Sequence, residues 1–204
     1  MEAASSILVA GSDTLLGAAI VAALRRGSHP NVATLDAASC TQPAAVEAAF
    51  TAARPSHVFV AAGRSAGIGG NLRDPVGLMT ESLAAVLAVI PAAHRHGVSK
   101  LLYFASSCCY PRDCPQPMAV AQLGSGPLEP SSAPYAAARL AGLTLCAAYQ
   151  RQHGARFLTA IPADAFGLEP RLDPDDLHVV PALLLRMHEA KQRGDRVVKV
   201  WGRT

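Results

Sequence analysis

The chain has 204 residues, half of them hydrophobic, and a formal net charge of +3. This length predicts one well-packed domain with at most a small appendage, and a small charge without a basic run argues against nucleic acid as a partner. The longest apolar stretch, 83–93, is too short to cross a bilayer. We therefore expect neither a membrane span nor a signal peptide. Five cysteines without framework or metal-ligand spacing favour reduced thiols in a cytoplasmic protein that binds no metal.

Strand and helix patterns alternate along the chain. In order, they predict a strand over 7–10, a helix over 15–26, a strand over 31–36, a helix over 43–53, a strand over 57–62, a helix over 75–97, a strand over 100–107, a helix over 134–154, a strand with its exit loop over 156–167, a helix over 177–194 and a last strand over 196–202. This alternation predicts an α/β fold with a parallel, doubly wound sheet, whose ligands lie at the carboxyl ends of the strands.

The stretch GSDTLLG follows the first predicted strand and opens the first helix. Gly11 permits a tight turn, Gly17 permits close packing of the helix, and the N–H groups around Thr14 and Leu15 face the space where a pyrophosphate binds. A glycine-bearing turn without a ligand is the alternative, but the place after the first strand favours a dinucleotide. Thr14 adds a side chain where backbone and phosphate approach, so we expect weakened affinity.

Asp36 ends the second strand, close to the distance of about 20 residues at which an acid accepts from the ribose hydroxyls of NAD. No lysine or arginine between residues 31 and 40 is present to bind a 2′-phosphate. Asp36 is equally well explained as a turn residue. Both interpretations stay open.

Tyr135 and Arg139 are four residues apart and share a helix face, downstream of the SSCCYP stretch that contains Ser106. A cation there stabilises a tyrosinate, and a serine hydroxyl holds a carbonyl beside the phenol. Such a serine, tyrosine and cation are typical of short-chain dehydrogenases when the cation is lysine. Cys108 lies two residues past Ser106 and can project near the same site, and His178 could supply an imidazole to it. Each of the last two is also explained as an ordinary buried thiol or a helix-start residue.

Several further stretches resemble the GDP-L-fucose synthases, which are extended short-chain dehydrogenase/reductases. They are LLYFASSCCYP, PQPM, GPLEP, PYAAARLAG, LCAAYQRQHG, HVVPALLLRMHEAK and VKVWG, and AAGRSAGIGGN extends the resemblance upstream. The resemblance implies epimerisation at sugar carbons 3 and 5 of GDP-4-keto-6-deoxy-mannose, then reduction of the 4-keto group with NADPH by a homodimer. It implies NADP as cofactor, with NAD as the alternative.

Carried over by resemblance, Ser106 orients the keto oxygen and Tyr135 donates the proton, with Arg139 at the position of the family's lysine. Cys108 matches the epimerisation base and His178 its acid partner. The remaining matched positions are Asp164, near the cofactor, and Arg186 and Trp201, which face the nucleotide sugar. The resemblance divides the chain into a dinucleotide-binding domain, 1–162, and the start of a substrate domain with the last sheet strand, 163–204.

The departures from the family pattern fall on functional positions: Thr14, Arg139 and Asp164, and an end at Thr204 that leaves the substrate domain incomplete. Alternatives therefore stay open beside the reductase. They are a catalytically impaired relative that binds nucleotide or pairs subunits, a truncated product, and a reductase of another keto-deoxy nucleotide sugar.

Overall fold

The computed structural model describes residues 5–163, 165–167 and 177–200. Within these ranges the strands are β1 (Ile7–Ala10), β2 (Val32–Leu35), β3 (His57–Val60), β4 (Lys100–Phe104) and β5 (Phe157–Ala160). They alternate with the helices α1 (Leu15–Arg26), α2 (Pro43–Ala53), α3 (Ile68–Arg73), α4 (Pro75–Arg95), α5 (Ala133–His153) and α6 (Val179–Arg193), and with the short 3-10 turns η1 (Ser39–Thr41), η2 (Ser107–Cys109) and η3 (Val120–Gln122). The strands are all parallel in the order β2-β1-β3-β4-β5, which confirms the predicted Rossmann-type sheet.

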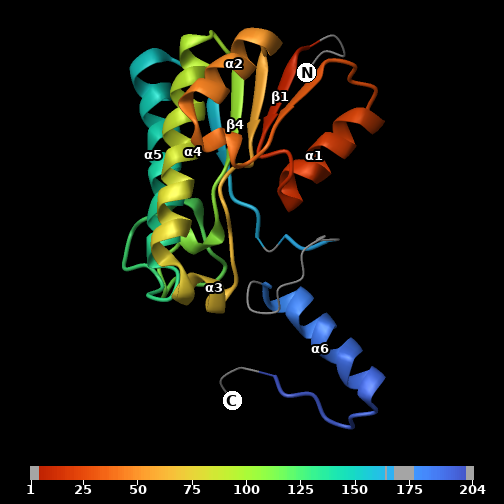
Figure 1. Ribbon diagram of the computed structural model, residues 1–204. Coiled ribbons are helices and arrows are strands. Elements are labelled where there is room, and N and C mark those ends of the chain that lie inside the picture. Colours follow the sequence, from red (N-terminus) through yellow and green to blue (C-terminus); the bar gives the residue numbers. More distant parts are fainter. Residues whose placement is uncertain (1–4, 164, 168–176, 201–204) are drawn as a thin grey trace.

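One face of the sheet is covered by α2, α4 and α5 (Figure 1). The alternation of buried residues along β3 and β4 places Val58, Val60, Leu101 and Tyr103 on this face, where they join the main hydrophobic core. Burial of these side chains removes apolar surface from water at roughly 25 cal/mol per Å². The main core thus lies between the sheet and this layer of three helices.

The opposite face is covered by α1, which lies alone on that side in Figure 1. The pairing register sets Val9, Phe59, Leu102 and Leu158 in one row across neighbouring strands on this face. Val9 is fully buried under α1, whereas Leu158 on β5 is 42% exposed. Among the described residues, helix cover on this face is therefore concentrated at the β1 side of the sheet.

Helix α4 is long and apolar enough to match a membrane span by length and composition, and half of that apolar window is buried inside the protein. Its buried side includes Ala85, Val89 and Ile90, which belong to the main core. The rows of small and branched residues on α4 thus serve the packing against the sheet and α5.

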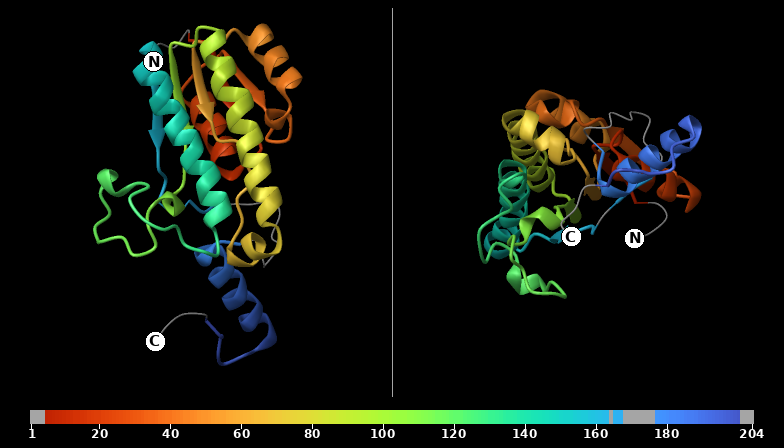
Figure 2. Two further views of the ribbon diagram at one scale, coloured as in Figure 1. Left: turned by 90° about the vertical axis from the view of Figure 1, so that its left-hand side faces the viewer. Right: turned by 90° about the horizontal axis from the view of Figure 1, so that it is seen from below.

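The predicted helix ends are confirmed at Gly154 and Gly194, which follow α5 and α6 with positive φ angles of 64° and 75°. The predicted last strand is wrong over its described part, because residues 196–200 form no strand. A strand forms only where an edge is available for pairing, and α6 carries this segment beyond the carboxyl edge of the sheet, away from both edge strands (Figure 1, Figure 2).

Candidate active site

The glycine turn between β1 and α1 fits closely against the exit of β3. Gly11 has a φ of +80°, and a Cβ atom built there would lie 2.5 Å from the Ala62 nitrogen. A Cβ on Gly17 would lie 1.9 Å from the Gly11 carbonyl oxygen. Both positions therefore require glycine for steric reasons, as the sequence predicts. No described residue accepts a hydrogen bond from the N–H groups of Leu15 and Leu16, which leaves these donors at the helix N-terminus for an anion.

Thr14 is the N-cap of α1. Its hydroxyl donates to the Gly11 carbonyl at 2.8 Å and accepts from the Gly17 N–H at 3.0 Å. A threonine cap of this kind stabilises a helix by about 1 kcal/mol. Sequence reasoning treated Thr14 only as an obstruction and missed this local bond between side chain and backbone. Its effect on a bound phosphate stays a prediction.

Two aspartates bind the loop at the exit of β2. Both carboxylate oxygens of Asp36 accept from Ser39, one from the N–H at 2.8 Å and one from the hydroxyl at 2.8 Å. These bonds hold the pKa of the Asp36 carboxyl below its ordinary value. Asp13, within the glycine turn, accepts from the Ala37 N–H at 2.7 Å. This geometry supports the turn interpretation of Asp36 and adds a second carboxylate, Asp13, that sequence reasoning missed.

Tyr135 and Arg139 share one face of α5, as their spacing predicts, and this face is buried. They are 8% and 5% exposed, and the Arg139 Cζ lies 5.1 Å from the centroid of the Tyr135 ring. This is cation–π distance, so the positive charge sits against the phenol ring. The guanidinium also donates to the carbonyl oxygens of Ala62 at 2.8 Å and Gly63 at 3.1 Å. Arg139 thus connects α5 to the exit of β3.

The loop after β4 lies against the start of α5. The Ser106 hydroxyl accepts from the Cys108 N–H at 3.2 Å, which leaves its own proton available to a ligand. The Ser106 carbonyl accepts from the Cys109 N–H at 3.0 Å, and the Cys109 thiol donates to the Ala136 carbonyl at 3.8 Å. Through these two contacts, Ser106 is held beside the first turn of α5, which carries Tyr135.

The adjacent cysteines differ in their surroundings. Cys109 is fully buried, and burial raises the pKa of its thiol. Cys108 is partly exposed. Of these two thiols, only that of Cys108 is accessible to a ligand, and that of Cys109 is part of the core, a distinction that sequence spacing does not make.

The other predicted residues lie on or near α6. His178 is the exposed N-cap residue of α6, and Arg186 is half-buried in the middle of that helix. No hydrogen bond between described residues joins His178 to Cys108. Asp164 and Trp201 lie outside the described residues. The structure thus joins the glycine turn and Arg139 at the exit of β3, holds the loop that carries Ser106 against the first turn of α5, and places His178 on another element, α6.

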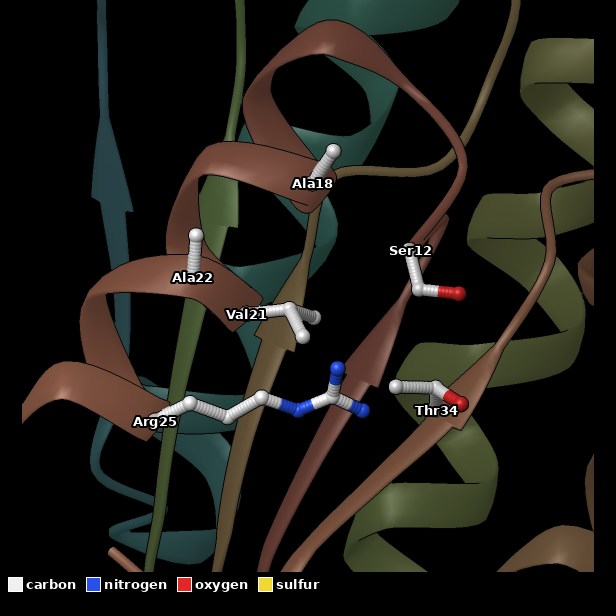
Figure 3. Close-up of a pocket in the computed structure, with 6 residues that line it drawn as sticks. All are labelled: Ser12, Ala18, Val21, Ala22, Arg25 and Thr34. Atoms are coloured by element: carbon white, nitrogen blue, oxygen red, sulfur yellow. The ribbon is translucent and has the colours of Figure 1, made fainter. Parts of the chain in front are cut away.

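A surface hollow lies between α1 and the edge strand β2 and borders the glycine turn at Ser12 (Figure 3). It is lined by Ser12, Ala18, Val21, Ala22, Arg25 and Thr34. The Arg25 side chain extends across it toward Thr34 (Figure 3). It contains none of the predicted catalytic residues, so the site is defined by the strand exits rather than by this hollow.

Comparison with known families decides the class of protein. The model of the NAD dependent epimerase/dehydratase family matches residues 7–204. The chain belongs to this family. Members share the dinucleotide fold, so the glycine turn at the exit of β1 stands where the fold places a dinucleotide.

Two curated relatives and one solved structure show which members the chain resembles. It is 37% identical over 204 residues to putative GDP-L-fucose synthase 2 of Arabidopsis thaliana, covering 99% of this chain and 62% of the relative. It is also 37% identical over 198 residues to GDP-L-fucose synthase of Escherichia coli (strain K12), covering 96% and 62%. A GDP-mannoheptose C4 reductase from Campylobacter jejuni with NADP bound superposes with a TM-score of 0.83 at 28% identity, covering 94% and 59%. The chain thus spans about three fifths of the length of the proteins that it matches.

Proposed function

We propose that this chain is a nucleotide-sugar oxidoreductase of the GDP-L-fucose synthase type, converting GDP-4-keto-6-deoxy-mannose to GDP-L-fucose. The observation that carries the proposal is that the glycine turn, the loop with Ser106, and the Tyr135 and Arg139 pair all lie at strand exits, with the Leu15 and Leu16 N–H groups unbonded among the described residues. The names of two relatives, both GDP-L-fucose synthases, support the same product.

The residues fit a dinucleotide. Side chains at Gly11 and Gly17 would fill the turn, and the N–H groups of Leu15 and Leu16 are the donors that a pyrophosphate needs. When bound, the dinucleotide supplies a hydride to the sugar ketone. NADP is our proposed cofactor, supported by the related reductase solved with NADP. NAD is the alternative, supported by the carboxylates of Asp13 and Asp36 at the exit of β2, where a 2′-phosphate would meet negative charge.

In the proposed reduction, the Ser106 hydroxyl donates a hydrogen bond to the keto oxygen and the Tyr135 hydroxyl gives it a proton. The buried Arg139 cation beside the ring stabilises the tyrosinate that remains. In the proposed epimerisation, Cys108 removes the protons next to the ketone and His178 returns them, which requires the start of α6 to approach the loop after β4. Arg186, Trp201 and Asp164 are proposed contacts of the GDP-sugar or cofactor.

The proposal keeps the division into a dinucleotide-binding domain, 1–162, and the beginning of a substrate domain, 163–204. It also assigns the chain to the cytoplasm, since its five cysteines are unpaired thiols.

The test is turnover. Purified chain mixed with NADPH and GDP-4-keto-6-deoxy-mannose is expected to oxidise NADPH and release GDP-L-fucose, identified by chromatography. If product forms only with another keto-deoxy GDP-sugar, that sugar would replace GDP-4-keto-6-deoxy-mannose as the proposed substrate. Saturable cofactor binding without turnover of either sugar would instead identify a nucleotide-binding relative, in which Arg139 is structural.

We further propose a homodimer paired through α4 and α5. Both helices lie on the outside of the sheet, and Leu87 on α4 is 62% exposed. Placing a charge in an apolar interface is costly, so Leu87→Asp is expected to convert the dimer to a monomer in analytical ultracentrifugation. Leu184→Asp on α6, where Leu184 is 59% exposed, is the matched control and should stay dimeric. A native chain that sediments as a monomer would contradict this arrangement.

A further inference from the structure

Both terminal nitrogens of the Arg139 guanidinium donate hydrogen bonds to backbone carbonyls. Its Nη1 atom donates to the carbonyl of Ala62 at 2.8 Å and to that of Phe104 at 3.5 Å, and its Nη2 atom donates to the carbonyl of Gly63 at 3.1 Å. The side chain is almost fully buried. Because hydrogen bonds to a buried charged group are costly to lose, the guanidinium has little freedom to move aside.

Gly63 stands directly against this guanidinium. A Cβ atom built on Gly63 would lie 2.9 Å from the Arg139 Nη2 atom and 3.2 Å from its Cζ atom. The same Cβ would lie 3.0 Å from the buried Ser82 hydroxyl oxygen. The φ of Gly63 is +100°, which side-chain-bearing residues rarely adopt. Any side chain at position 63 therefore meets both a strained backbone and an immobile cation.

We propose that Gly63 and Arg139 are a matched pair. Because glycine has no side chain, the guanidinium occupies the space that a side chain at position 63 would fill. Gly63 thereby positions the cation beside Tyr135. The pairing rests on contacts within the protein. Its importance for proton transfer rests on the proposed function, in which Tyr135 is the donor.

Two buried polar atoms, one in Arg139 and one in Ser82, support a close steric fit between the guanidinium and Gly63. In the described part of the chain, the Arg139 Nε atom and the Ser82 hydroxyl have no hydrogen-bond partner. A planar guanidinium occupies the space beside Gly63, whereas the ammonium of a lysine is a compact charge on a flexible stem. Arginine at position 139 thus adds a steric reason for glycine at 63, beyond the backbone strain and the Ser82 contact, that lysine would not supply.

The test is a double-mutant cycle in thermal stability. Gly63→Ala is expected to lower Tm by about 8 °C when Arg139 is present, from backbone strain and steric overlap together. In the Arg139→Lys background, the same Gly63→Ala change is expected to lower Tm by less than half as much, because only the strain and the contact with the rotatable Ser82 hydroxyl remain.

Gly97→Ala is the matched control. Gly97 has a φ of +67° with no atom within 4 Å of a built Cβ, so its substitution adds strain without overlap. It should lower Tm equally in the Arg139 and Lys backgrounds. Equal losses from Gly63→Ala in both backgrounds would overturn the pairing.

Activity provides a separate measurement. If the chain turns over, the kcat lost in Gly63→Ala should be partly restored when Arg139→Lys is added, and a failure of this rescue would overturn the positioning role. If the chain does not turn over, the proposed function fails while the cycle in Tm still decides the pairing.

Discussion

Tyr135→Phe is expected to lower the rate of ketone reduction by about 10²- to 10⁴-fold, the range over which a positioned proton donor acts. The substitution removes only the hydroxyl. The ring that packs against Arg139 stays, so dinucleotide affinity and Tm should change little. Steady-state oxidation of NADPH with the keto sugar measures the rate, and a titration measures the affinity.

Tyr103→Phe is the matched control for this loss. Tyr103 is a fully buried tyrosine whose hydroxyl donates to the Arg139 carbonyl at 3.3 Å, and burial raises the pKa of its phenol to about 12. Such a phenol is a poor proton donor near neutral pH, so the control should keep the parent rate. A Tyr135→Phe chain that reduces ketone as fast as the parent would remove Tyr135 from the mechanism.

Gly17→Ala is expected to destabilise the chain by about 3 kcal/mol and to abolish dinucleotide binding. Alanine in the first turn of an ordinary helix is more stable than glycine by about 0.5–1 kcal/mol. At position 17 alanine is instead expected to lower the stability, because its Cβ atom would lie 1.9 Å from the Gly11 carbonyl oxygen. Urea unfolding measures the loss of stability.

Gly27→Ala, at the other end of α1, separates this overlap from a general effect of glycine removal. Its φ is −76°, and a built Cβ lies at an ordinary 3.4 Å from the Ala23 oxygen. We expect a change in unfolding free energy within about 1 kcal/mol and unaltered dinucleotide affinity. A Gly17→Ala chain as stable as the parent would contradict the close fit of the glycine turn.

Local patterns in the sequence predicted the strands, the long helices and their glycine ends, because these depend on residues close in the chain. Residues 68–73 were not predicted to be helical, since their glycines carry little helix signal. The prediction of a last strand was wrong because a strand forms only beside a free sheet edge, which other parts of the protein supply. Strand formation is decided by pairing, which local composition does not contain.

The site was predictable where it depends on spacing and hidden where it depends on distant contacts. The shared face of Tyr135 and Arg139 follows from a separation of four residues. The bonds from Arg139 to Ala62 and Gly63 join residues about 77 positions apart, so no local pattern indicates them. The helix cap at Thr14 could have been predicted, because a threonine just before a helix is a typical N-cap. It was not, because position 14 was compared only with the glycine of a dinucleotide motif.

We expect a dinucleotide to bind at the glycine turn with its reactive end beside Tyr135. Titration of the chain with NADPH and with NADH, followed by cofactor fluorescence, tests it most directly. We expect saturable binding of one molecule per chain for at least one of the two dinucleotides, lost in Gly17→Ala and retained in Gly27→Ala. A folded chain that binds neither dinucleotide, or that binds one equally well after Gly17→Ala, would contradict it.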